Sequence, residues 1–183
     1  MNTSLENAIK YFKDALTKEG IDPAKGLGED LFLFISTLTP MPNVDLLVTG
    51  ENGILLSWRD DVCGQGWHIP GGIIRYQETL EQRLHATAIS ELGCDATFED
   101  EPFKIVEIIK TDISYKGWPE ECRGHALSLL YKCSVDEKLL KNCDGKKISG
   151  HLGWFDQVPE NFLESQDVYR ETLNGYFGSI HYR

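Results

Sequence analysis

The sequence predicts an α/β fold, and three observations carry this prediction. Apolar residues recur at helical spacing near the N-terminus, two β-rich runs follow from Asn43, and a helix-favouring stretch separates these runs from later strands. Hydrophobic residues make up 41% of the 183 residues and aromatic residues 10%. That content is enough to build a core in one domain of ordinary size.

The N-terminal segment predicts a helical arm over residues 1–42. Thr3 and Glu6 have the spacing of a capping box. An apolar stripe at helical spacing then runs toward Gly20, and it consists of Leu5, Ile9, Phe12 and Leu16. The apolar segment 29–37 has no clear period and is compatible with a second, short helix. We therefore divide the chain into an arm, 1–42, and a main domain, 43–183.

The main domain begins with a predicted hairpin, in which NVDLLVT and ILLSW flank a GENG turn. A polar loop is expected at 60–66, a short strand at 67–70 and a helix at 78–92. Strand character returns in FKIVEIIKTDISY, GHALSLLYKCSV and ISGHLGWFD. A last helix is expected over about 160–173.

The charge and the cysteines limit the partners and the compartment. Lys and Arg total 18 against 29 Asp and Glu, which gives a net charge of −11. A field of this sign repels nucleic acid and anionic membranes, so we expect neither as a partner, and a phosphate ligand would need a divalent cation. Five cysteines without a C-x-x-C pair favour reduced thiols. The N-terminus lacks the apolar core of a signal peptide, so we expect a cytoplasmic protein.

The stretch WHIPGGIIRYQETLEQRLHATAISELG carries the strongest functional signal. Gly71 and Gly72 let the backbone approach a ligand or a metal, although a glycine pair is also compatible with a plain tight turn. In the helix that follows, Glu91 ends a stripe that also contains Leu80, Leu84 and Thr87. A carboxylate on such a face needs a compensating cation, unless it is a solvated residue of the last turn before a Gly93 cap.

The spacing of this stretch resembles the box of the Nudix hydrolases, which reads G, five residues, E, seven residues, then R-E-U-x-E-E-x-G-U, with U a bulky aliphatic residue. Gly72, Glu78, Glu91 and Gly93 match it, while residues 86–91 read Ala-Thr-Ala-Ile-Ser-Glu in place of R-E-U-x-E-E. The resemblance implies an α/β/α sandwich around a mixed sheet. It also implies a Mg²⁺ ion, or Mn²⁺, at Gly71, Gly72, Glu78 and Glu91.

One branch of the family, similar to GDP-mannose mannosyl hydrolase, also has a depleted box. The resemblance to that branch implies one magnesium ion and cleavage of the sugar carbon to oxygen bond of a nucleotide sugar. It implies substrate contacts from Asp45 and Arg59, and a general base at His151. Arg59, Glu91 and His151 are then the expected catalytic residues.

Several other polar residues are open to two interpretations. Arg123 and His125 are expected to bind substrate, although an arginine at such a place is more often a surface ion pair. Arg83 could replace the absent box arginine by pairing with Glu78 or Glu91. His68 is expected to pack at a strand end. Glu120 and Glu121 are rivals for the general base or for a metal ligand.

Three functions follow from these residues, and they belong to two classes. The first is hydrolysis of a nucleoside diphosphate linked to another group, preferably a sugar. The second is a pyrophosphatase acting on ADP-ribose or a dinucleotide, and the third is a domain that binds a nucleotide without catalysis. The apolar stripe of the arm needs a cover, so we also expect a homodimer.

Overall fold

The computed structural model describes residues 3–61, 64–109 and 125–180, and it contains four α-helices and eight strands within them. The helices are α1 (Thr3–Lys18), α2 (Glu29–Ser36), α3 (Leu80–Thr87) and α4 (Arg170–Ile180). The strands are β1 (Met41–Gly50), β2 (Gly53–Asp61), β3 (Gly64–His68), β4 (Gly71–Ile73), β5 (Thr97–Phe98), β6 (Lys104–Ile109), β7 (His125–Ser134) and β8 (Leu152–Phe155).

The strands form one mixed sheet, as predicted. Strand β1 lies at its centre, and the path through it runs β3-β2-β1-β7-β5. Strands β1 and β7 pair in parallel, whereas β1 pairs with β2 and with β4 in antiparallel fashion. Strand β8 extends the sheet beyond β2, and β6 pairs with β7. The register of β4 on β1 places Gly71 opposite Asp45.

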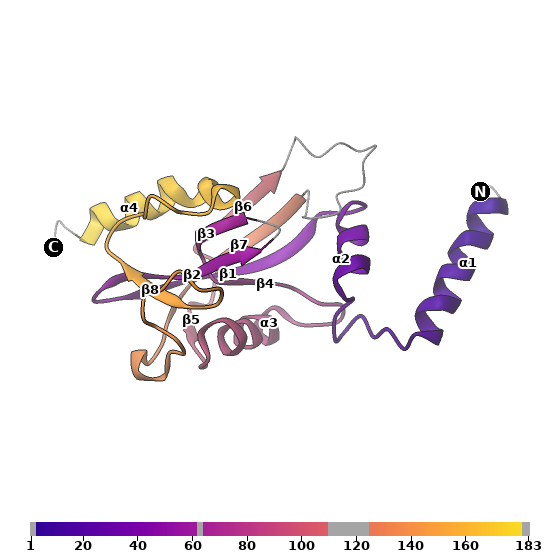
Figure 1. Ribbon diagram of the computed structural model, residues 1–183, viewed down its shortest axis with the longest axis horizontal. Helices are drawn as coiled ribbons and strands as arrows, with labels where there is room; N and C mark the ends of the chain where they lie inside the picture. The colour runs from indigo at the N-terminus through magenta and orange to yellow at the C-terminus, as the bar shows by residue number, and fades with distance from the viewer. Residues whose placement is uncertain (1–2, 62–63, 110–124, 181–183) are drawn as a thin grey trace.

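Helices cover both faces of the sheet, which gives the expected α/β/α sandwich (Figure 1). Helix α3 lies against one face, where Val44, Leu46 and Val48 of β1 pack against Leu84. Helix α4 lies on the other face with Leu47 of β1. Because side chains alternate along β1, they pack into two separate cores, one on each face of the sheet.

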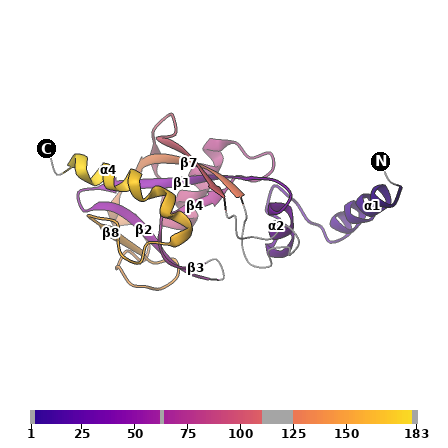
Figure 2. The same cartoon turned by 90° about the horizontal axis from the view of Figure 1, so that it is seen from above.

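The N-terminal helices lie at one end of the molecule, away from the C-terminal helix (Figure 2). Helix α2 stands next to the sheet and α1 stands beyond it, with the rings of Phe12 and Phe34 6.2 Å apart between their centroids. The stripe of α1 remains exposed, since 53% of Leu5 and 42% of Ile9 are accessible. The boundary between arm and domain at residue 42 stays a prediction.

Two segments differ from the sequence-based expectation. The expected loop at 60–66 contributes instead to a hairpin, because Asp60 pairs with Gln65 and Asp61 with Gly64. The last helix begins at Arg170 rather than near residue 160, after a 3₁₀ segment Glu164–Tyr169. Its expected start lies beside Pro159, whose fixed backbone favours a turn. None of the described helices is long and apolar enough to cross a membrane.

Candidate functional site

The paired glycines lie on β4, at the edge of the helix α3 layer. A Cβ added to Gly71 would overlap Oδ1 of Asp45, and one added to Gly72 would lie 2.6 Å from Oγ1 of Thr87. Both glycines are thus required by close packing between β4, β1 and α3. This packing brings the glycine backbone directly beside the box helix.

Glu78 braces the loop between β4 and α3. Its two carboxylate oxygens accept hydrogen bonds from Arg83, at 2.8 Å from Nε and 2.6 Å from Nη2, and the amide of Arg75 donates a third at 2.9 Å. These bonds hold the pKa of Glu78 below its usual value. Arg83, which lies one helical turn before the box arginine position at residue 86, therefore takes the place of that arginine. Glu78 thus pairs with Arg83 in this structure, and its expected role as a metal ligand stays a prediction.

The helix starts with a capping box of its own. The Thr79 hydroxyl accepts from the amide of Gln82 at 3.2 Å, and Gln82 accepts from the amide of Thr79 at 2.9 Å. The α-helix continues into a π-helical segment, Ala88–Leu92, and ends at Gly93 with φ 84°. Glu91 lies in this π-helical segment and is half-buried.

Glu91 lies close to two positive side chains. Burial raises the pKa of Glu91, while the charges of Lys141 and Arg59 act in the opposite direction. Lys141 also donates a hydrogen bond from Nζ to the carbonyl of Ser90. The side chain of Arg59 is 27% exposed, and its Nε lies 3.4 Å from Oδ2 of Asp61. The Glu91 carboxylate is thus half-buried and close to two cations, and its position in a cleft stays a prediction.

His151 is oriented by a carboxylate. Its Nδ1 lies 2.9 Å from Oδ1 of Asp144, and its side chain is 19% exposed. The carbonyl of His151 accepts a hydrogen bond from the amide of Trp58 at 2.8 Å, so His151 adjoins the strand position before Arg59. Hydrogen bonds from Lys146, and then from His151, hold the pKa of Asp144 well below its usual range. A histidine held in this way can accept a proton at Nε2.

Asp45 lies on β1, in the strand where it was expected, and is buried there. It is 1% exposed, and its oxygens accept hydrogen bonds from Asn43 (2.6 Å) and from the hydroxyl of Tyr169. Asn43 also donates to the Ser128 hydroxyl at 3.1 Å. Burial and the Asp45 charge raise the pKa of Tyr169. The surrounding protein encloses the Asp45 carboxylate in a polar network, and its expected contact with substrate stays a prediction.

The remaining candidates lie elsewhere or outside the described residues. His125 begins β7 and lies 3.1 Å from Oε1 of Glu107 on β6, which makes it part of a cross-strand pair. His68 is buried, and its Nδ1 lies 2.8 Å from the carbonyl of Ile69, in agreement with the packing interpretation. Arg123, Glu120 and Glu121 lie outside the described residues.

The donor set limits the kind of metal site that this region can form. No group of three or more His, Cys, Asp or Glu that could hold a metal comes together within the described part of the chain. Mg²⁺ is often held by one or two carboxylates together with substrate phosphates. Glu91 suits a site in which substrate phosphates supply the other ligands, because a cation would offset the cost of burying its carboxylate. Oγ1 of Thr87, buried and without a hydrogen-bond partner among the described atoms, lies one turn before it.

The mixed sheet with helices on both faces is the arrangement expected for the fold of the Nudix hydrolases. Comparisons with solved structures show the same fold in this chain. A UDP-X diphosphatase matches with a TM-score of 0.55 and 16% identity, over 78% of this chain and 64% of that one. A MutT Nudix hydrolase from Burkholderia pseudomallei matches with a TM-score of 0.52 and 20% identity, over 73% and 97%.

Sequence comparison gives a more limited match. A stretch of 78 residues, which is 42% of this chain, is 36% identical to the low-salt glycan biosynthesis protein Agl8 of Haloferax volcanii. The match spans half the length of that curated relative. No family model matches the chain.

Three residues of this region were missed by the sequence analysis, namely Lys141, Asp144 and Tyr169. Asp144 lies seven residues before His151 in a turn with Gly145, which is the one local signal that could have drawn attention to it. Lys141 contacts a carbonyl 51 positions earlier and Tyr169 a carboxylate 124 positions earlier. No local pattern predicts such distant contacts.

Proposed function

We propose that this protein is a metal-dependent hydrolase of nucleoside diphosphates linked to another group, with a nucleotide sugar as the preferred substrate. The observation that carries the proposal is the half-buried Glu91 beside Arg59, at the end of the helix that the glycine pair introduces. We further propose that the protein acts in the cytoplasm and as a homodimer.

Glu91 would hold a Mg²⁺ or Mn²⁺ ion, with the glycine backbone close by. Such an ion, when bound, neutralises part of the diphosphate charge and improves the diphosphate as a leaving group. Arg59 would grip phosphate oxygens through its guanidinium, which can donate two parallel hydrogen bonds. Lys141 adds a further positive charge near Glu91.

His151 would act as the general base. Nε2 would take a proton from the attacking water while Asp144 stabilises the resulting imidazolium. A bond then forms between the water oxygen and the anomeric carbon, and the bond from that carbon to the diphosphate oxygen breaks. The products are a nucleoside diphosphate and a free sugar.

The named relatives support this choice of substrate. The Haloferax relative is a glycan biosynthesis protein by name, and glycans are assembled from activated sugars such as nucleotide sugars. One structural neighbour is a UDP-X diphosphatase, which is named for a substrate with a nucleoside diphosphate part. That neighbour also supports the alternative in which water attacks phosphorus, as in a pyrophosphatase acting on ADP-ribose or a dinucleotide.

The deciding experiment is a substrate panel of nucleotide sugars, ADP-ribose and dinucleotides, with Mg²⁺ or Mn²⁺ and ¹⁸O-labelled water. We expect the label in the free sugar. A label in a phosphate product would instead establish attack at phosphorus. The Glu91→Gln variant, with its folding checked by circular dichroism, should lose about a hundredfold or more in kcat. No hydrolysis of any compound would favour a domain that only binds nucleotides.

A further inference from the structure

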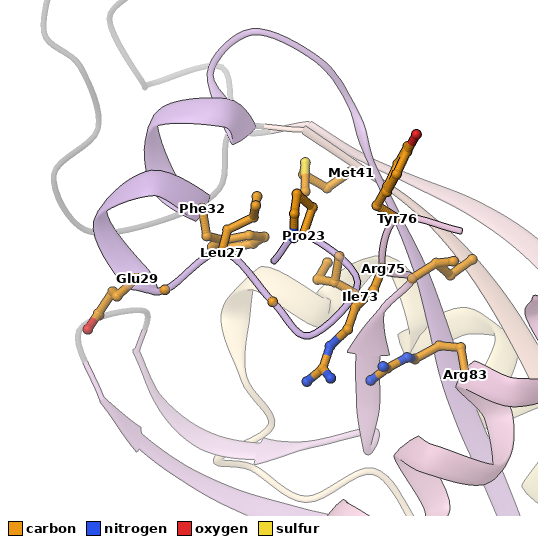
Figure 3. Close-up of a pocket in the computed structure, with 12 residues that line it drawn as sticks. Pro23, Leu27, Glu29, Phe32, Met41, Ile73, Arg75, Tyr76 and Arg83 are labelled. Atoms are coloured by element: carbon orange, nitrogen blue, oxygen red, sulfur yellow. The ribbon is translucent and has the colours of Figure 1, made fainter. Parts of the chain in front are cut away.

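A pocket lies beside the loop that follows the glycine pair of β4. It has a volume of about 430 Å³ and lies between the segment that leads into α2 and the loop from β4 to α3. Figure 3 shows it open between these two elements. Its volume falls in the range of pockets that bind small organic ligands. Glu91, Arg59 and His151 are not among its lining residues.

The walls of this pocket are largely apolar and include aromatic rings on two sides. Phe32 comes from α2 and Tyr76 from the β4 to α3 loop, while Leu27, Met41 and Ile73 supply aliphatic surface. Tyr76 is 65% exposed, so most of its surface is accessible to a ligand. Rings on separate elements form a surface on which a flat aromatic group can stack.

One end of the pocket is cationic. Figure 3 shows the guanidinium groups of Arg75 and Arg83 directed toward the same end, while the carboxylate of Glu29 points to the opposite side. Arg83 is already bound by both oxygens of Glu78. The charge of Arg75 acts on Glu78 at longer range, but among the described residues no side chain accepts a hydrogen bond from its guanidinium, and a Cβ at Gly26 would lie 4.0 Å from its Nε. Arg75 thus keeps its hydrogen-bond donors for an external anion.

The pocket combines aromatic rings with one guanidinium that makes no hydrogen bond to a described side chain, in a chain of net charge −11, and this combination favours one class of ligand. An uncharged apolar ligand would leave Arg75 unused, and a bare phosphate would leave the apolar walls in water. A flat ring linked to a phosphate satisfies both. We propose that this pocket binds a nucleoside monophosphate unit, with the base between Phe32 and Tyr76 and the phosphate on Arg75.

The choice of a nucleotide rests in part on the proposed function, but the pocket is separate from the residues proposed to perform hydrolysis. It adjoins β4 and α3 through Ile73 and Arg83, but none of Glu91, Arg59 and His151 lines it. Binding there can be measured without turnover. Failure of hydrolysis and failure of this binding are therefore distinguishable.

The chain itself offers a reporter for the pocket. It contains two methionines, Met1 and Met41, and Met41 lines the pocket. With ¹³C-methyl methionine, the Met41 signal, assigned by Met41→Leu, should shift on titration with AMP, GMP, UMP or CMP. Met1 serves as the internal reference. The matching nucleosides test the base alone, and inorganic phosphate tests the anion alone.

We expect a saturable Met41 shift with at least one monophosphate, and Arg75→Gln should weaken that binding about tenfold or more. Binding of the matching nucleoside should change little in this variant, whereas Phe32→Ala should weaken both. Arg170→Gln is the matched control, because Arg170 pairs with Asp167 outside the pocket. The Glu91→Gln variant should keep the Met41 shift even though it loses hydrolysis.

Three outcomes would overturn the proposal. Nucleotide binding detected by calorimetry without a Met41 shift would place the ligand elsewhere. Equal affinities of Arg75→Gln and the unsubstituted protein for the monophosphate would show that Arg75 does not contact the phosphate. A Met41 signal that moves with protein concentration alone would mean that a second copy of the chain occupies the pocket.

Discussion

Lys141 brings a fixed positive charge to the part of the helix where the Nudix box usually has two adjacent glutamates. Its ammonium donates to the carbonyl of Ser90 and lies close enough to Glu91 to affect its pKa. A cation at this place does two things. It stabilises the negative end of the helix, and it competes with any divalent ion that approaches Glu91.

The substitution Lys141→Met should separate these two effects. Loss of the contact with the helix end should lower the free energy of unfolding by about 0.5 to 1 kcal/mol. Loss of the competing charge should raise the affinity for Mn²⁺ several-fold, measured by electron paramagnetic resonance titration of the intact protein.

The matched control for this experiment is Lys138→Met, because Lys138 is exposed and lies in the same connection. It should change neither quantity. Unchanged Mn²⁺ affinity in Lys141→Met would show that the ammonium does not influence Glu91 in solution.

Single residues of the site were predictable where their partners lie within a few positions. The spacing of the box drew attention to Glu91, and Arg83 was expected to pair with Glu78 or Glu91, of which the structure shows the pair with Glu78. The role of Asp45 was not predictable, because its enclosure depends on Tyr169 from the far end of the chain. An aspartate in a strand has the same local pattern whether it faces a cleft or a buried tyrosine.

At the scale of elements, the ion pair of Glu78 and Arg83 fixes the loop that presents the glycines. Its side chains are only 15% and 9% exposed, so removal of one partner leaves a charge with little water around it. Arg83→Ala should lower the free energy of unfolding by about 3 kcal/mol in urea denaturation. Restoring an arginine at the box position, in Arg83→Ala with Ala86→Arg, should recover part of this loss.

The pH dependence of stability provides the control for this pair. A carboxyl group whose folded pKa lies below its ordinary value of 4.5 stabilises the fold above that pH, and the stabilisation is lost as pH falls through the folded pKa. The stability difference between the protein and Glu78→Gln should therefore shrink below about pH 4.5. A difference that stays constant down to pH 3 would contradict the role of this ion pair.

Two glycines in different elements test the close packing of β4. Gly71→Ala should destabilise the protein by about 2 kcal/mol, because the added methyl would overlap the enclosed Asp45. Gly175 lies in α4 with nothing within 4 Å of an added Cβ, so Gly175→Ala should stabilise by about 0.5 to 1 kcal/mol. Thermal unfolding measures both, and similar effects at the two positions would contradict the packing argument.

The type of each long element was predictable because hydrophobic periodicity is a local property. Helix α1, the β1 to β2 hairpin and strands β6, β7 and β8 appear where the pattern indicates them. The pattern does not reveal the π-helical segment, Ala88–Leu92, or the 3₁₀ segment before α4. Both depend on how the chain packs at the ends of helices, where propensities differ little.

At the scale of the whole molecule, the sandwich has two cores but its N-terminal arm has an uncovered stripe. Helix α1 stands at the end of the molecule, and Leu5, Ile9 and Phe12 are each more than a third exposed (Figure 1). Exposed apolar stripes of this kind are energetically unfavourable in water and are usually covered by a partner. A second copy, paired through α1, would cover both stripes at once.

We therefore expect a homodimer in solution, with twice the chain mass of 20.7 kDa in light scattering coupled to size exclusion. The double substitution Leu5→Asp and Ile9→Asp should convert it to a monomer, because two charges on the stripe would be buried in the dimer. The control is Lys10→Asp with Lys13→Asp, which changes charges on the exposed arm outside the stripe. A monomeric mass for the unsubstituted protein across its usable concentration range would refute pairing through α1.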